Sequence, residues 1–408
     1  MSQITKNDFD LVIAGADLNC YNVARAFHEA YGTVAFAFGR YEIGCTKHSR
    51  IVKFTEVPDF DNPDTFVKTL LDFASTHTER KLILIGCTDD YAGLIIKSKE
   101  KLKAHYIMPY IDEELWQKLQ SKANFYKVCD TYGIKYPSTK IIDKDYDASV
   151  LDSLGFDYPI IVKPSSSILY WKYPFDGMKK VYFADTPEKA KDIIDTIYAS
   201  GYPDEIILQD TIPGEDSNMR VLTAYSDKDG KVRMMCLGHV LLEEHSPKAR
   251  GNHAAILTED NRELCEFYKN YLESIGYVGF SNFDIKFDER DGTYRAFEIN
   301  LRQGRSNYYV TASDCNIARL IVEDRLGDGL EGVRFGKPAF WHIIPKKIIY
   351  SYLTKLPEIK KELHALVAEK KEFSSYFYKF DLKYNPRRIF YALAYTFNHY
   401  NKYRKYPK

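Results

Sequence analysis

Residues 280–304, FSNFDIKFDERDGTYRAFEINLRQG, place three oxygen-bearing side chains and an arginine on two short apolar runs joined by a turn. Successive side chains of a strand point to opposite faces, so Glu298 and Asn300 share one face while the apolar residues between them pack behind. Asp284 and Lys286 share a face of the preceding run by the same rule. The connecting segment DERDGT is short enough to join the two runs as a hairpin.

The hairpin predicts a metal and phosphate site. Two carboxylates and one amide carbonyl, from Asp284, Glu298 and Asn300, form a hard oxygen set that suits Mg²⁺ or Mn²⁺, with further positions left for water and phosphate. Arg302 continues the same face, and its guanidinium could bind a phosphate or a developing oxyanion through two parallel donors. The alternative is a solvated polar face with an exposed arginine.

Length and composition indicate a globular protein. A chain of 408 residues, 45% hydrophobic and 28% charged, is expected to form two or three domains with a sizeable core. No apolar run reaches the roughly 18–20 residues of a membrane span, and MSQITKNDFD does not read as a secretory signal. Single, scattered cysteines predict reduced thiols in a cytoplasm rather than a disulfide framework or a zinc site. They are Cys20, Cys45, Cys87, Cys129, Cys236, Cys265 and Cys315.

The charge is zero overall but unevenly distributed. Residues 336–408 contain sixteen Lys and Arg but only five Asp and Glu, and they are rich in Tyr and Phe. This helical, basic tail is expected to be attracted to anionic surfaces or anionic substrates. Packing of its aromatic residues onto the body is an alternative, and nothing else in the chain supports nucleic-acid binding.

The first 115 or so residues alternate strand, turn and helix, which predicts an open, mostly parallel sheet. Ligands of such sheets lie at the carboxyl ends of the strands, which makes Asp17, Asn19 and Asp89 candidate substrate contacts. Helix capping is the alternative role for these residues. No G-x-G-x-x-G follows the first strand, and Cys45 stands where a P-loop needs lysine, so neither a dinucleotide site nor a Walker site is expected.

Residues 120 to about 330 predict a mixed α+β region with antiparallel hairpins, one of them turning at Asp229-Gly230. The order of its elements resembles the ATP-grasp superfamily of carboxylate–amine ligases. The matching pieces are the EINLR strand, the preceding FDIKFD strand, IIVKP with its loop, and LQDTIPGED. The resemblance implies a Rossmann-like domain at 1–118, an ATP-grasp domain of two α+β subdomains at 119–335, and a helical region at 336–408.

The same resemblance assigns roles to residues. Lys163 and Lys122 would bind nucleotide phosphates, Gln209, Asp210 and Ile212 would line the adenine through backbone groups, and Glu215 would lie near the ribose. Asp284, Glu298 and Asn300 would hold Mg²⁺, with Mn²⁺ as an alternative, and Arg302 would face the transferred phosphate. The phosphate loop departs from the family, because SSSILYWKYPFDG has only Gly177 where several glycines are usual. Its hydroxyls and Lys172 could replace donors, Tyr or Trp could form a lid, or the loop is a surface flap.

Over the whole length, LVIAGADLNCYNVARAFHEAYG, EEHSPKARGNHAAI and FGKPAFWH are similar to the D-aspartate ligases of Gram-positive cell-wall synthesis. The resemblance implies ATP-dependent joining of D-aspartate to the lysine ε-amine of a UDP- or lipid-linked peptidoglycan precursor. It implies a cytoplasmic location, with the inner face of the membrane within reach of the tail. A ligase forming another amide or dipeptide, and a non-catalytic nucleotide-binding scaffold, are the alternatives. Substrate contacts are expected from Arg250, Asn252, His253 (also a candidate base), Arg305, Ser306 and Asn307.

Overall fold

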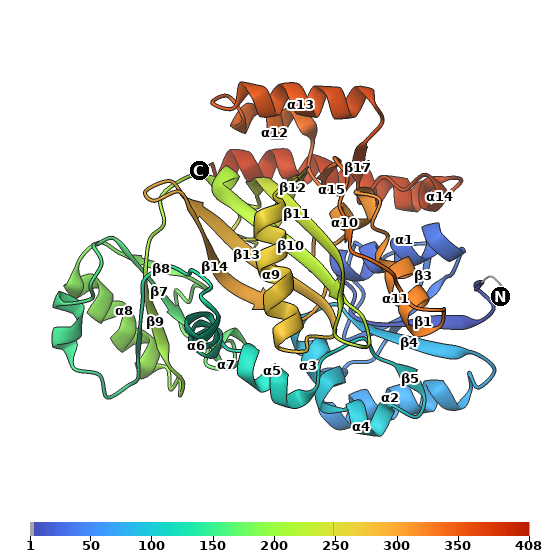
Figure 1. Cartoon of the computed structure of the whole chain (residues 1–408), viewed down its shortest axis with the longest axis horizontal. Coiled ribbons are helices and arrows are strands. Elements are labelled where there is room, and N and C mark those ends of the chain that lie inside the picture. The colour runs from blue at the N-terminus through green and yellow to red at the C-terminus, as the bar shows by residue number, and fades with distance from the viewer. Residues whose placement is uncertain (1–3, 248, 408) are drawn as a thin grey trace. The chain divides into compact units, whose positions relative to one another are not determined.

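The computed structural model describes residues 4–247 and 249–407, which group into two compact units (Figure 1). The first unit combines the residues up to Glu113, Met219–Asn282, and those from Asn300 onward; the second combines Glu114–Asn218 and Phe283–Ile299. Compactness therefore groups the chain differently from the three expected regions. The boundaries 1–118, 119–335 and 336–408 follow from family architecture and stay a prediction.

The N-terminal part of the first unit is the open parallel sheet that its sequence predicts. Its five strands are all parallel, in the order β3-β2-β1-β4-β5. Asp17 and Thr88 each accept a backbone N–H at the start of a helix, so these two polar residues act as helix caps. The elements are β1 Phe9–Ala14, α1 Leu18–Tyr31, β2 Ala35–Gly39, β3 Val52–Glu56, α2 Pro63–Ser75, β4 Lys81–Gly86, α3 Asp89–Lys97, α4 Lys99–Leu102 and β5 Tyr106–Ile107.

A larger sheet has the strand order β14-β13-β10-β11-β12-β16-β17, with β15 pairing on β11. The predicted hairpin between β10 and β11 forms, and Gly230 supplies the positive φ that its turn needs. Helix α9 packs against β10 and β11 (Figure 1). The elements are β10 Met219–Ser226, β11 Val232–Glu243, β12 His253–Glu259, α9 Arg262–Ser274, β13 Gly279–Asp288, β14 Thr293–Asn300, β15 Arg334–Phe335, β16 Phe340–His342 and β17 Glu372–Ser374.

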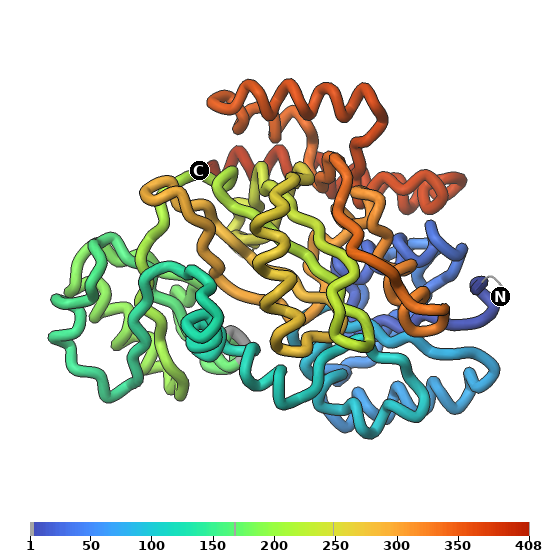
Figure 2. Tube along the Cα trace, viewed as in Figure 1, coloured from blue at the N-terminus to red at the C-terminus, as the bar shows by residue number. Residues whose placement is uncertain are grey.

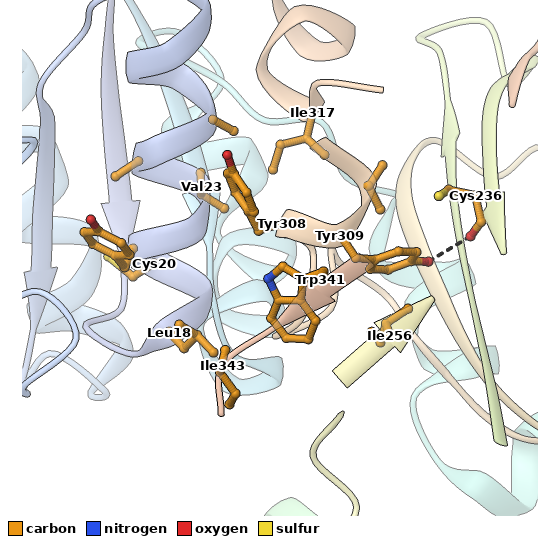
Figure 3. Packing of buried hydrophobic residues seen from close by; sticks show 14 of the residues in the cluster. Leu18, Cys20, Val23, Cys236, Ile256, Tyr308, Tyr309, Ile317, Trp341 and Ile343 are labelled. Carbon is orange, nitrogen blue, oxygen red and sulfur yellow. Dashed lines mark hydrogen bonds between the residues drawn. The ribbon is translucent and has the colours of Figure 1, made fainter. Parts of the chain in front are cut away.

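One hydrophobic core joins distant parts of the chain in the first unit. Helix α1, near the N-terminus, packs against α10 and α11, some 300 residues later (Figure 2). Figure 3 shows Tyr308, Tyr309 and Trp341 in this core, and the Tyr309 hydroxyl donates to the Cys236 carbonyl at 2.8 Å. The remaining helices of this unit are α10 Tyr308–Ala312, α11 Ile317–Arg325, α12 Lys346–Tyr352, α13 Pro357–Ala368, α14 Lys379–Leu382 and α15 Pro386–Lys405.

The second unit has its own core beneath a four-stranded antiparallel sheet, in the order β6-β9-β7-β8. Helix α8 packs against β7 and β8. The phosphate-loop sequence contains a short helix, α7, where an irregular loop was expected. The elements are α5 Glu113–Leu119, α6 Lys122–Tyr132, β6 Thr139–Ile142, β7 Ile160–Pro164, α7 Ser167–Tyr170, β8 Tyr182–Ala184, α8 Pro187–Ala199 and β9 Ile206–Asp210.

The described residues settle the state of the cysteines and the nature of the helices. All seven cysteines are buried and free, as their single spacing predicted. Across residues 4–247 and 249–407, no helix combines the length and the apolar character needed to cross a bilayer.

We expect Gly279 to be irreplaceable in the first unit. Its φ is +91°, and a Cβ built there would lie 2.0 Å from the Pro109 carbonyl oxygen. Gly276 has a similar φ of +64° with nothing within 4 Å, so it is a matched control. Gly276→Ala should cost about 1 kcal/mol, whereas Gly279→Ala should cost about 3 kcal/mol or more because backbone must also move. Thermal unfolding of both variants measures this, and equal melting temperatures would contradict it.

Candidate active site

Three lysines surround one carboxylate in the second unit. Lys122 opens helix α6, whose first turn is capped by Ser121, and its ammonium forms an ion pair with Glu298 on β14. Lys163, from the end of β7, and Lys180 also act on Glu298 electrostatically. Burial opposes the charge of Glu298, but the Lys122 and Lys180 ammonium groups outweigh it and hold the pKa of Glu298 well below its usual range. Positive charge exceeds negative charge here, which favours an anion.

Lys163 is held by a buried polar network. Its Nζ donates to Gln209 Oε1 at 2.7 Å and lies 3.4 Å from the Tyr126 hydroxyl. Gln209 Nε2 in turn donates to the hydroxyls of Tyr126 and Thr139, at 2.9 and 2.8 Å. Burial, reinforced by the neighbouring Lys122 charge, lowers the pKa of Lys163 to about 7. An anion bound beside Lys163, in addition to Glu298, would raise the pKa of Lys163 and keep its side chain charged.

The segment after β9 is fixed by side chains of the β13–β14 hairpin. Arg290 clamps the Asp210 carboxylate, with nitrogen–oxygen distances of 2.5 and 3.2 Å. Lys286 Nζ donates to the carbonyl oxygens of Ile212 and Gly214, at 2.8 and 3.3 Å. The Glu215 N–H donates to Asn218. The side chain of Gln209 is hydrogen-bonded within the chain, as its backbone is in β9. The Ile212 carbonyl already accepts a hydrogen bond from Lys286.

The predicted metal ligands lie on neighbouring strands. Asp284 is on β13, and Glu298 and Asn300 are on β14. Asn300 Nδ2 donates to the Asn282 carbonyl at 3.4 Å. Within the described residues, no three His, Cys, Asp or Glu side chains cluster as a metal site. Two carboxylates and an amide fit Mg²⁺ or Mn²⁺ as a partial set of hard oxygen donors, which phosphate oxygens or water would complete.

Arg302 lies in the first unit and is gripped by Asp89 from the first turn of α3. Its Nε and Nη2 contact the two Asp89 oxygens at 2.8 and 3.0 Å, and its Nη1 donates to the Gln303 carbonyl at 2.9 Å. The Arg302 side chain is 12% exposed and that of Asp89 56%. Asp89 therefore positions the guanidinium from the solvent side.

The turn after Arg302 is fastened to the N-terminal sheet by buried amides. Asn19 Nδ2 donates to the carbonyls of Cys87 and Gln303, at 2.8 and 3.2 Å. Asn19 Oδ1 accepts from Asn307 Nδ2 at 2.8 Å and from Gln303 Nε2 at 3.3 Å. Because its amide groups are engaged within the chain, Asn19 holds the turn in place. Ser306, beside Asn307, is also buried.

A second guanidinium faces a buried acid. Arg305 Nη2 contacts Glu244 Oε1 at 2.8 Å, while its Nη1 is buried without a hydrogen-bond partner. Burial raises the pKa of Asp17, although the charges of Arg305 and Arg302 act against that rise. The Glu244 N–H donates to the Asn252 carbonyl, which brings the turn of the exposed Arg250 and the buried His253 to this region. One unpaired guanidinium nitrogen is a carboxylate-binding feature.

Several residues of these networks were not predicted from sequence. Lys180, Tyr126, Arg290 and Glu244 carry no local motif, since each gains its role from a distant partner. For Lys180 the one available signal was its position at the end of the phosphate-loop sequence. Lys172, which was expected to replace some donors of the phosphate loop, is exposed on that loop.

Comparisons with known proteins give a full-length relative and many solved structures of similar fold. No family model matches the chain. A D-aspartate ligase of Enterococcus faecium (strain Aus0004) is 38% identical over 418 residues, covering 100% of this chain and 98% of the relative.

Three solved structures illustrate the shared fold. The biotin carboxylase domain of Hydrogenobacter thermophilus 2-oxoglutarate carboxylase aligns with a TM-score of 0.63 at 15% identity, over 83% of this chain and 74% of the other. N5-carboxyaminoimidazole synthetase from Staphylococcus aureus aligns with a TM-score of 0.59 at 15% identity, covering 83% of both chains. L-amino acid ligase from Bacillus licheniformis aligns with a TM-score of 0.56 at 13% identity, over 79% and 75%.

The lowered pKa of Lys163 predicts how this side chain reacts. Only a neutral amine is acetylated, so trace labelling of Lys163 should rise with pH around a midpoint of about 7. Lys191 is a control, because its ion pair with Asp195 raises its pKa and delays labelling to strongly alkaline solution. Glu298→Gln should lower the Lys163 midpoint further, since it removes a nearby negative charge. Mass spectrometry follows the labelling of each lysine against pH. Coincident profiles for Lys163 and Lys191 would contradict the lowered pKa of Lys163.

Proposed function

The chain belongs to the D-aspartate ligase family and is an ATP-dependent carboxylate–amine ligase of ATP-grasp fold, and from this premise we propose that it joins D-aspartate to the lysine ε-amine of a peptidoglycan stem-peptide precursor. The observation that carries the proposal is 38% identity along the whole chain to a D-aspartate ligase. ADP and phosphate are the other products.

The reaction needs an activated carboxylate, because an oxide ion is too poor a leaving group for an amine to displace. Transfer of the ATP γ-phosphoryl group to a carboxylate oxygen of the amino acid gives an acyl phosphate and releases ADP. The neutral lysine amine then attacks the acyl carbon, phosphate leaves with the C–O bond electrons, and the amine loses a proton. Binding and charge stabilisation supply most of the catalysis in such phosphoryl transfers.

The lysines of the second unit would bind the nucleotide phosphates. Lys122, Lys163 and Lys180 together exceed the single charge of Glu298, and a phosphate beside Lys163 would raise its pKa and keep it charged. The base and ribose would lie along the segment after β9, near Gln209, Asp210, Ile212 and Glu215. Asp284, Glu298 and Asn300 would hold Mg²⁺, or Mn²⁺ in its place, which when bound neutralises charge on the phosphates.

The arginines of the first unit would act on the reacting carboxylate and phosphoryl group. Arg302, positioned by Asp89, would stabilise the phosphoryl group in transfer. The unpaired Nη1 of Arg305 would bind the second carboxylate of the amino acid, which D-aspartate has and a neutral amino acid lacks. Further substrate contacts would come from Asp17, Arg250, Asn252, His253, Ser306 and Asn307. Asn19 was also expected to touch substrate, but it is buried and its amide is engaged within the chain, so it positions the turn instead.

The acceptor would be an anionic precursor on the cytoplasmic side of the membrane. A UDP- or lipid-linked stem peptide carries phosphates, and the sixteen basic residues of 336–408 would attract it. Contact of this tail with the inner leaflet would place the enzyme beside a lipid-linked acceptor.

The function is tested by ADP release with each D- and L-amino acid, with and without a lysine-containing muropeptide precursor. We expect D-aspartate to give the fastest turnover and the precursor to be required for amide formation. Mass spectrometry of the product should show one aspartyl residue on lysine. A preference for another amino acid, or a free dipeptide as product, would contradict the substrate assignment while leaving the ligase class intact.

Substitutions of Glu298 and Arg302 should strongly lower this activity without unfolding the chain. We expect Glu298→Gln and Arg302→Ala each to lower amino-acid-dependent ADP release by about a hundredfold to a thousandfold. EDTA should stop the reaction, and Mg²⁺ or Mn²⁺ should restore it. Glu266→Gln and Arg262→Ala are controls, because both side chains are exposed on α9. Wild-type rates in both site variants would remove the metal-strand assignment.

A further inference from the structure

Most of the large apolar side chains that are exposed in the described residues lie near the end of the chain. Thirteen large apolar or aromatic side chains are exposed among the described residues, and eight of them lie between Phe377 and Tyr400. On α15, Phe390 and Phe397 are 69% and 62% exposed, and Leu393 between them is 42% exposed. Residues spaced by three or four positions share one face of a helix. Helix α15, whose place in the fold is labelled in Figure 1, therefore presents an apolar stripe to solvent.

Helix α15 buries polar side chains and exposes apolar ones, which is the opposite of a typical surface helix. Its inward residues are Arg388, Ala392, His399 and Tyr403, so that a guanidinium and an imidazole are buried while phenylalanines face out. Burying such groups is costly unless they are paired. Arg388 lies 3.1 Å from Asp381 and stacks on Tyr21 at 4.4 Å. These contacts fix the rotation of the helix about its axis.

The charged residues at this end of the chain are nearly all basic. On α15 itself, Arg387, Arg404 and Lys405 are exposed, whereas Arg388 points inward. Between Phe377 and Pro407 the basic residues are Lys379, Lys383, Arg387, Arg388, Lys402, Arg404 and Lys405, and the single acid is Asp381. Asp381 is fully buried and is engaged by Tyr21, Ser49 and Arg388. Outward-facing aromatic residues flanked by lysine and arginine are complementary to a surface that is both anionic and apolar.

We propose that the outward face of α15, defined here as Ile389, Phe390, Leu393, Phe397 and Tyr400 with Arg387, Arg404 and Lys405, docks onto an anionic lipid bilayer. The aromatic residues enter the interface between headgroups and acyl chains, and the cations contact lipid phosphates. Two copies facing each other would bring like charges together, which disfavours a dimer through this face. As a route to a lipid-linked acceptor, the inference rests on the proposed function; the surface itself does not.

Vesicle co-sedimentation of the full-length chain tests the proposal. We expect binding to phosphatidylglycerol-containing vesicles, weak binding to pure phosphatidylcholine, and weakening by added salt. Phe390→Ser with Phe397→Ser should lower the partition coefficient about tenfold or more. The matched control is Phe183→Ser with Phe267→Ser, which removes two exposed phenylalanines of 46% and 42% exposure elsewhere in the chain and should bind as the wild type does.

Three results would overturn the docking surface. They are no binding to anionic vesicles, undiminished binding by the Phe390/Phe397 variant, and a wild-type dimer in sedimentation velocity that this variant dissociates. Unchanged thermal unfolding and unchanged ADP release with a soluble precursor should show that the variant is folded and active. An inactive wild type that still binds anionic vesicles would contradict the proposed reaction and support the surface.

Discussion

The ion pair between Lys122 and Glu298 is the interaction on which the charge balance of the second unit depends. Glu298 faces three lysines, one of which, Lys163, is buried deeply enough for its pKa to fall to about 7. A single carboxylate does not compensate all three lysines, which is consistent with the lowered pKa of Lys163, and an anion beside Lys163 would raise that pKa and keep the side chain charged. In the proposed reaction the lysines would attract the nucleotide phosphates, and the divalent ion would balance the negative charge of those phosphates.

In the first unit, buried amides fix the geometry of the turn that follows Arg302. Asn19 uses both ends of its amide to hold the turn at 303–307, and Asp89 holds Arg302 through two oxygens. The N-terminal sheet resembles a dinucleotide-binding domain in its strand order. Asn19 and Asp89, at the carboxyl ends of its strands, nevertheless contact and hold the segment that follows β14. Preorganised donors need such support, because an arginine that swings between rotamers stabilises a transition state poorly.

The sequence was sufficient where the interactions are local or periodic. Strand alternation predicted the β13–β14 hairpin, Asp229-Gly230 predicted the β10–β11 turn, and the strand–helix repeat predicted the parallel sheet. It was insufficient where partners lie far apart in the chain. Glu244 becomes the partner of Arg305 across 61 residues, and Arg290 reaches Asp210 across 80. The grouping of residues beyond 300 with the first unit likewise depends on a core that α1 shares with α10 and α11, which no local pattern encodes.

The tail was expected either to pack on the body or to meet an anionic surface, and α15 has a buried inner face and an exposed apolar outer face. Its inner face is part of the structure of the first unit. Lys402 lies 3.5 Å from Glu244, whose other oxygen holds Arg305, and the Tyr403 hydroxyl donates to the Glu243 carbonyl at 2.5 Å. Deleting the tail would leave the buried Glu244 with one cation fewer and would uncover Tyr21, which contacts Asp381 and Arg388 of the tail. Lost activity would therefore not reveal which face of α15 mattered. Substitutions confined to the outward residues separate the roles of the two faces, because Phe390 and Phe397 are largely exposed and contribute little to the hydrophobic core.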